Sequence, residues 1–183
     1  MDKFDERKIV SLLSDPATSR KAFGMVVEQY GEQLYWQVRR IVLSHDDAND
    51  VMQNVFVKAW TGIGSFRNDS KLSTWLYRIA VNESLDFMRR RKAVHEVSAD
   101  DADAGVANAL LADKYFDGDE TAAQLQQAIA LLPEVQRTVF NLRYYGEMKY
   151  SEMSRVLGTS EGALKASYHI AVKKISEYFK NRD

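Results

Sequence analysis

The chain has 183 residues, 45% of them hydrophobic and 28% charged, which is the composition of a globular protein with one or two domains. The absence of cysteine excludes disulfides and thiolate metal sites, and the three histidines lack the spacing of a metal site. No apolar run approaches the ~20 residues that span a bilayer, and the mixed charges of the N-terminus are unlike a secretory signal. We therefore expect a cytoplasmic protein that needs no cofactor.

The net charge of −1 conceals an uneven distribution of charge. Residues 62–92 hold seven Lys and Arg against three Asp and Glu, residues 93–120 hold one against eight, and residues 121–183 hold nine against six. Two prolines and nine glycines, with long amphipathic periods, indicate a nearly all-helical chain. We expect an all-α protein in which two small helical domains, 1–92 and 121–183, are joined by a flexible acidic linker, 93–120.

Residues 5–61 have helical periodicity, and Ser44 is the expected N-cap of the helix that contains DDANDVMQNVFVKAW. This helix has one apolar side, made by Ala48, Val51, Met52, Val55, Phe56 and Ala59. The opposite side has an acidic rim beside one valine, which suits the docking of another protein. We call this set the docking face: Asp47, Asp50, Gln53, Asn54 and Val57. A solvated acidic surface is the alternative interpretation.

Residues 61–70 (TGIGSFRNDS) predict a loop, and residues 71–91 predict a helix without Gly or Pro. The helix has two apolar sides. The first holds Leu72, Leu76, Ile79, Ala80 and Phe87, and the second holds Tyr77, Val81, Leu85 and Met88. Between them runs a narrow polar strip: Lys71, Trp75, Arg78, Asn82 and Arg89. A helix that is apolar on two sides is held inside a bundle, so the polar strip is the side expected to face outward.

The polar strip combines side chains that suit single-stranded DNA. Its cations attract phosphates, Trp75 offers a ring to an unstacked base, and Asn82 offers a donor and an acceptor to a base edge. The preceding loop is small and polar enough to form a pocket. Two other interpretations stay open: Trp75 belongs to the core, and Arg78 pairs with Asp86 or Glu83.

The C-terminal segment contains a helix-turn-helix pattern. Two helical stretches stop at Pro133 and Gly146, and a shorter one ends at Gly158. After the turn formed by Gly158 and Thr159, Ser160 is the expected cap of a longer helix. The inward side of that last helix is apolar: Leu164, Tyr168, Ala171, Ile175 and Phe179.

The second helix of such a module lies in the major groove of DNA. We call its outward residues the recognition face: Ser160, Gly162, Lys165, Ala166, Ser167, His169 and Lys173. Lys165 and His169 can reach base edges, and the small Gly162 and Ala166 permit close approach. Lys173 is better placed for a phosphate, which positions the protein without specifying sequence. A solvated face on an ordinary helical hairpin is the alternative.

The chain resembles the extracytoplasmic-function (ECF) sigma factors of bacterial RNA polymerase in three blocks: DDANDVMQNVFVKAW, FRNDSKLSTWLYRIAVNESLDFMRRR and LPEVQRTVFNLRYYGEMKYSEMSRVLGTSEGALKASYHIAVKKI. The resemblance covers residues 23–179 apart from the acidic linker. It implies a promoter-specificity subunit, not an enzyme, with sigma regions two and four only. The implied partners are core RNA polymerase, through its β′ clamp and β flap, promoter DNA, and an anti-sigma factor.

The resemblance also implies roles for the three surfaces. In that family, the helix that matches the docking face binds the clamp coiled coil. The helix that matches the polar strip, with its preceding loop, opens the minus-ten element and holds a flipped base. The minus-ten contacts implied here are Phe66, Lys71, Trp75, Arg78, Asn82, Asp86 and Arg89. The recognition face would read the minus-thirty-five duplex.

The chain departs from the family at two positions. Ser167 stands where many relatives have arginine, so a promoter sequence cannot be transferred from them. Asn54 stands where an acid is usual on the docking face, which softens that contact.

Three other functions are less well supported by the sequence. A free-standing helix-turn-helix regulator is the main alternative, but it would leave the polar strip and the docking face without a purpose. An enzyme acting on nucleic acid would need convergent carboxylates or histidines, whereas the acids here lie in the linker or on solvated faces. A helical adaptor is disfavoured by the concentration of cations.

Overall fold

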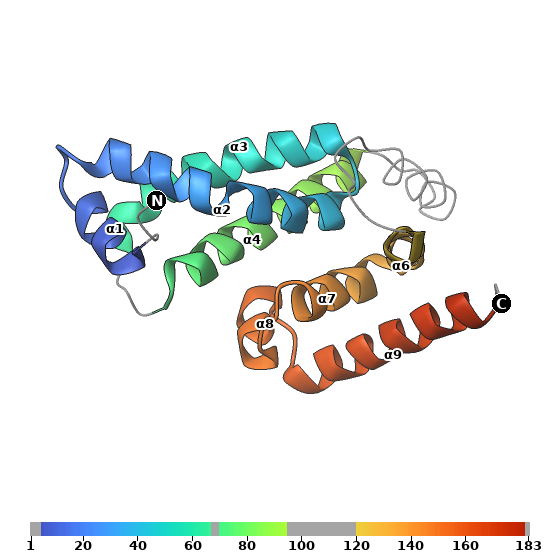
Figure 1. Cartoon of the computed structure of the whole chain (residues 1–183). Helices are drawn as coiled ribbons and strands as arrows, with labels where there is room; N and C mark the ends of the chain where they lie inside the picture. The colour runs from blue at the N-terminus through green and yellow to red at the C-terminus, as the bar shows by residue number, and fades with distance from the viewer. Residues whose placement is uncertain (1–4, 67–69, 95–119, 182–183) are drawn as a thin grey trace.

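The computed structural model describes residues 5–66, 70–94 and 120–181, and every regular element in these ranges is a helix. The all-α prediction is therefore confirmed. The predicted acidic linker falls almost entirely outside the described residues, as does the part of the predicted loop at 67–69. Figure 1 shows the helices as two groups, with α1 to α4 in one and α6 to α9 in the other.

The first bundle is formed by α1 (Glu6–Leu13), α2 (Ser19–Val42), α3 (His45–Gly62), a 3-10 turn η1 (Ile63–Ser65) and α4 (Leu72–Val94). Ser44 caps α3 as predicted, since its hydroxyl accepts a hydrogen bond from the amide of Asp47 at 3.3 Å. The predicted loop is shorter than expected, because α3 continues to Gly62 and η1 follows directly. The core draws on all four α-helices, with Val26, Leu34, Val55, Leu72 and Leu76 at 0% exposure.

The start of α4 is fixed by a carboxylate from α1. The amide of Leu72 donates to Glu6 Oε1 at 2.7 Å, and the hydroxyl of Tyr30 donates to Glu6 Oε2 at 3.1 Å. An acid at a helix N-terminus satisfies a free amide and favours the helix dipole. Burial and the Glu6 carboxylate together raise the pKa of Tyr30 to about 12. The helix that carries the polar strip is thus held at its first turn by two other helices.

The second bundle is formed by α6 (Glu120–Ala130), α7 (Glu134–Tyr144), α8 (Tyr150–Leu157) and α9 (Glu161–Lys180). The predicted helix-turn-helix consists of α8 and α9. Gly158 ends α8 in the left-handed conformation, with a φ of 64°, which suits glycine at a helix C-terminus. Ser160 caps α9 as predicted, because its hydroxyl accepts from the amide of Ala163 at 3.3 Å. A single residue, Thr159, lies between these two caps, so α8 and α9 are joined by a tight turn.

The two bundles pack against each other. A buried apolar cluster joins Ile41 of α2 and Val81 of α4 to residues of the second bundle, among them Leu142 and Met153. Within the described ranges, no helix combines the length and the apolar character that a membrane crossing requires.

Candidate nucleic-acid interface

The docking face lies along the outer side of α3, as the helical period predicted. Asp50, Gln53, Asn54 and Val57 are exposed, and Val57 has 61% of its surface accessible. Asp47 is half-buried because its Oδ2 accepts a hydrogen bond from the Arg91 guanidinium of α4 at 3.0 Å. Four of the five residues are therefore available to a partner.

The polar strip faces outward from α4, but its five residues differ in exposure. Lys71, Asn82 and Arg89 are exposed, whereas Trp75 and Arg78 are half-buried. Each apolar side contains fully buried residues, with Leu76 and Val81 at 0% exposure, and the other apolar positions of α4 are buried or half-buried. The outward orientation is therefore confirmed for Lys71, Asn82 and Arg89, whereas Trp75 and Arg78 are partly covered.

Trp75 lies at the edge of the core, so it is neither a fully buried core residue nor a fully exposed ring. Its ring packs against Phe66, with centroids 5.5 Å apart and planes tilted by 51°. A Cβ atom at Gly62 would lie 3.3 Å from Trp75 Cζ2, so glycine permits the close approach of this ring. Because Trp75 and Phe66 are both half-buried, Trp75 presents part of its ring within the strip and Phe66 presents part of its ring next to it.

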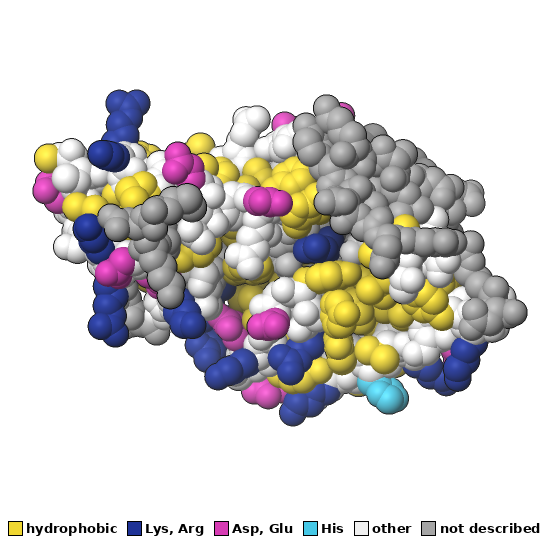
Figure 2. All heavy atoms as spheres, viewed as in Figure 1, with side chains coloured by type: hydrophobic (Ala, Val, Ile, Leu, Met, Phe, Trp, Pro, Cys, Tyr) yellow, Lys and Arg dark blue, Asp and Glu magenta, His cyan; other side chains and the backbone are white. Residues whose placement is uncertain are grey.

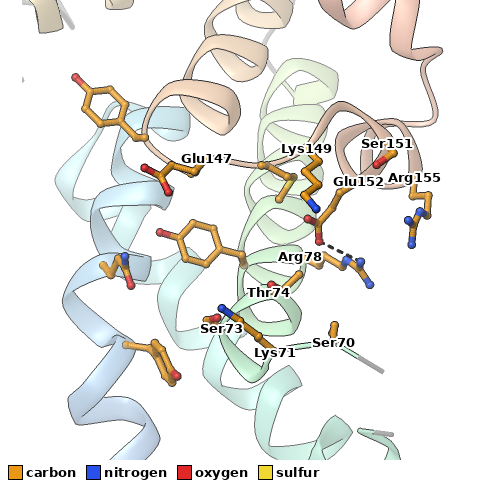
Figure 3. Close-up of a pocket in the computed structure, with 16 residues that line it drawn as sticks. Ser70, Lys71, Ser73, Thr74, Arg78, Glu147, Lys149, Ser151, Glu152 and Arg155 are labelled. Carbon is orange, nitrogen blue, oxygen red and sulfur yellow. Dashed lines mark hydrogen bonds and ion pairs between the residues drawn. The ribbon is translucent and has the colours of Figure 1, made fainter. Parts of the chain in front are cut away.

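Arg78 pairs with a residue that sequence reasoning did not consider. Its Nη2 lies 3.1 Å from Glu152 Oε1 of α8 (Figure 3). The two acids expected as partners are engaged elsewhere: Glu83 forms a short ion pair with Lys58, and Asp86 lies 3.2 Å from the Arg89 guanidinium. The alternative interpretation, in which Arg78 pairs with Asp86 or Glu83, is therefore wrong, because packing of the two bundles brings Glu152 to Arg78.

A cleft of about 960 Å³ lies between the first turns of α4 and the second bundle, and Lys71 and Arg78 of the polar strip line it. Figure 3 shows Lys71, Ser73, Thr74 and Arg78 on one side of it, with residues of the second bundle opposite. The opposite wall is also charged: Glu147, Lys149, Glu152 and Arg155. No local pattern marks these four residues, since they meet the strip only through the tertiary fold.

The recognition face lies on the outer side of α9, opposite the buried Leu164. All of its members except the half-buried Ser167 are exposed. Lys165 Nζ lies 4.0 Å from Glu161 and 5.6 Å from the ring centroid of Tyr150, an exposed and weakly held position. Figure 2 shows Lys and Arg side chains gathered along the lower edge of the molecule, where the second bundle lies. This distribution suits a polyanion.

The comparisons with known proteins agree with this geometry. The sequence matches the family models "Sigma-70 region 2" over residues 26–94 and "Sigma-70, region 4" over residues 122–175. The ECF RNA polymerase sigma factor SigW of Bacillus subtilis is 31% identical over 156 residues, which cover 81% of this chain and 83% of SigW. The chain belongs to the ECF sigma factors. SigM of Mycobacterium tuberculosis is 33% identical over 162 residues, or 88% of this sigma factor and 79% of SigM.

Two solved structures share the fold. CnrH in complex with the cytosolic domain of CnrY has a TM-score of 0.65 at 24% identity, covering 97% of this chain and 99% of CnrH. The sigma factor RpoE of Bartonella quintana, in complex with the anti-sigma factor NepR, has a TM-score of 0.66 at 22% identity, covering 87% of this chain and 98% of RpoE.

Family membership decides between the functions considered from the sequence. The protein is a transcription initiation factor that binds core RNA polymerase and directs it to promoters, and it is not an enzyme. The region-two match contains the docking face and the polar strip, and the region-four match contains α8 and most of α9. A free-standing regulator finds no support in these matches.

Proposed function

We propose that this ECF sigma factor uses three separate surfaces during initiation. The docking face binds the β′ clamp, the polar strip with Phe66 and Asp86 holds the melted minus-ten strand, and the recognition face reads the minus-thirty-five duplex. The domains 1–92 and 121–183 divide this work, and the β flap is the expected contact of the second. A cytoplasmic location follows from binding to core polymerase.

The observation that carries the proposal is the fixed orientation of the polar strip. Buried residues on both flanks hold α4, so Asn82 remains exposed between the exposed cations Lys71 and Arg89. Cations supply attraction to phosphates without sequence, and an amide adds base selection. Unpairing a base costs a few kcal/mol, which contacts to the released single strand offset. A preformed strip does not have to be ordered when the strand arrives.

The docking face supports clamp binding through its combination of charge and one apolar side chain. Asp50 and the protruding Val57 are both exposed on the same side of α3, about two turns apart, so the face combines a negative charge with a small apolar contact. Rim charges of this kind raise the rate of association and select the partner, while the apolar group loses water on contact. Asn54 within the same face is uncharged, where an acid is usual in the family.

The recognition face supports duplex reading through its small and cationic residues. Gly162 and Ala166 are exposed on the first turns of α9, so the helix backbone can approach the base edges closely. Lys165 and His169 extend from the same side, and Lys173 lies about two turns beyond Lys165. Ser167, which is half-buried, stands where many relatives have arginine, so a promoter sequence cannot be transferred from them.

An anti-sigma factor is a proposed partner. The related RpoE was solved with the anti-sigma factor NepR, and CnrH with the cytosolic domain of CnrY. The similar fold of this chain supports regulation by a protein of that type.

Site-specific photo-cross-linking tests the proposal. A photoreactive amino acid at Asn82, in holoenzyme assembled on a promoter, should cross-link to the non-template strand within the minus-ten element. The same amino acid at Gln29, which is exposed on α2, is the matched control and should give no DNA product. Cross-links from Asn82 to duplex DNA outside the opened region would contradict the proposed role.

A further inference from the structure

The cleft between the two bundles contains charged residues that belong to none of the three surfaces proposed for initiation. Lys149 and Arg155 lie outside the polar strip and the recognition face, yet both line the cleft opposite Lys71 and Arg78 of α4 (Figure 3). We propose that the cleft is a binding site for a nucleoside polyphosphate, a ligand that joins several phosphates to a planar base. The inference goes beyond the proposed function, because none of the three surfaces requires a small ligand.

One half of the cleft attracts anions. Lys71 and Arg78 line it from α4, and Lys149 and Arg155 line it from the second bundle. Only the Arg78 guanidinium is paired, with Glu152 at 3.1 Å, whereas the other three cations form no ion pair with a described residue. Cations without partners repel one another, so an anion with several charges is stabilised between them. The same part of the cleft holds hydroxyl groups that can donate to phosphate oxygens: Ser70, Thr74 and Ser151.

The other half of the cleft suits a planar base. Tyr77 of α4 is half-buried in its wall, and burial raises the pKa of this phenol, so the ring stays uncharged near neutral pH. Aromatic rings stack on bases whatever the base is. The Gln33 amide and the Glu147 carboxylate line the same cleft and can hydrogen-bond to a base edge. Figure 3 shows Glu147 and Arg155 at opposite ends of the cleft, so this carboxylate lies away from the cationic half.

The size of the cleft fits such a ligand better than a single small anion. Its volume of about 960 Å³ lies near the upper end of the range of about 300–1,000 Å³ that is typical of small-molecule sites. A lone phosphate would contact only the cationic half. A phosphate chain joined to a base spans both halves, with the phosphates among the cations and the base beside Tyr77.

Two residues of the cleft occupy positions that are locally unfavourable for them. Glu147 has a left-handed backbone with a φ of 49°, a conformation that favours glycine. Lys149 is the N-cap of α8, where Ser, Thr, Asp or Asn is preferred, and its side chain makes no capping bond. Residues that break a local rule are expected at functional sites. Both exceptions line the cleft, and a ligand in the cleft gives each of them a role.

Isothermal titration calorimetry of the full chain tests the site with GTP, GMP and inorganic tripolyphosphate as probes. GTP should bind at one site per chain and at least tenfold more tightly than GMP, because two more phosphates reach the cationic half. Absence of GTP binding, or equal affinities for GTP and GMP, would overturn the proposal.

Variants at exposed positions test each half of the cleft. Lys149→Ala should weaken GTP binding by roughly tenfold, whereas Lys21→Ala, at an exposed position of α2 outside the cleft, should leave it unchanged. Equal losses in these two variants would show unspecific attraction and overturn the site. Gln33→Ala should weaken GTP binding by roughly fivefold and leave tripolyphosphate binding unchanged, because tripolyphosphate has no base. An equal effect of Gln33→Ala on both probes would overturn the assignment of a nucleoside.

A fluorescent single-stranded oligonucleotide distinguishes this site from the polar strip. Lys71 and Arg78 belong to both, whereas Lys149 belongs to the cleft alone. If Lys149→Ala weakens binding of the oligonucleotide and GTP does not bind, the cleft holds a DNA strand and the proposal is overturned. If GTP binds and depends on Lys149 while the wild-type holoenzyme does not bind the oligonucleotide, the nucleotide site stands and the proposed role of the polar strip fails.

Discussion

Replacing Asn82 with alanine isolates the contribution of one side chain to promoter opening. Asn82 is exposed, and its side chain forms no hydrogen bond within the described part of the chain, so its removal leaves no buried group unpaired. Alanine is the better helix former by up to ~0.7 kcal/mol, so α4 should be at least as stable in the variant. Loss of a two-point contact to a base edge is worth ~1–3 kcal/mol. That is roughly 5- to 150-fold in the equilibrium between closed and open promoter.

Permanganate reactivity of unpaired thymines measures this opening directly. The Asn82→Ala holoenzyme should form closed complexes normally but show reduced reactivity on duplex promoters. A template with a pre-melted bubble should recover part of the lost transcription, because base unpairing no longer has to be offset. Gln29→Ala, at an exposed position on α2, should behave as the wild type on both templates. Equal opening by the Asn82→Ala and wild-type proteins would refute the reasoning.

Three further predictions concern the other surfaces and the stability of the first bundle. The double variant Asp50→Lys/Gln53→Lys should bind core polymerase more weakly in a pull-down. Its helical content, measured by circular dichroism, should stay constant. Unchanged binding would show that the docking face does not contact the polymerase. Lys165→Ala should change the preferred upstream sequence, with ~1–3 kcal/mol of discrimination lost. Lys173→Ala should weaken binding to all sequences alike and reduce the salt dependence of binding. The same uniform loss of affinity in both variants would show that the two lysines are wrongly assigned. The pKa of Tyr30 is raised from 10.0 to about 12 in the folded protein, so folded Tyr30 holds its proton more tightly than unfolded Tyr30. The resulting contribution to stability is complete below pH 10 and is lost as the pH rises toward 12. In denaturant unfolding, the Tyr30→Phe variant should lose less stability between these pH values than the wild type does. Identical pH profiles of the two proteins would contradict the assigned role of Tyr30.

Much of the fold followed from local pattern in the sequence. Ser44 and Ser160 cap their helices as predicted, and Gly158 forms the expected turn, because capping and left-handed conformations depend on neighbouring residues alone. The outward orientation of most residues of the docking face and the recognition face, and of Lys71, Asn82 and Arg89 in the polar strip, followed from helical period in the same way.

The contacts between distant segments could not be predicted from the sequence. The Arg78 pair with Glu152 joins residues 74 positions apart, and Glu6 meets the amide of Leu72 over 66 positions. No local rule selects one acid among the 26 in the chain as the partner. The apolar second side of α4 did carry a signal, because Val81 and Leu85 pack against the second bundle. That pattern indicated a second covering surface without indicating which segment supplies it.

The central claim is that this chain confers promoter recognition on core RNA polymerase. The most direct measurement is run-off transcription of genomic fragments by purified core polymerase, with and without the protein. We predict that discrete transcripts appear only when the protein is present, and that Asn82→Ala reduces them on duplex templates. Tight binding of the protein to fragments without polymerase, together with no protein-dependent transcript, would contradict the claim and favour a free-standing regulator.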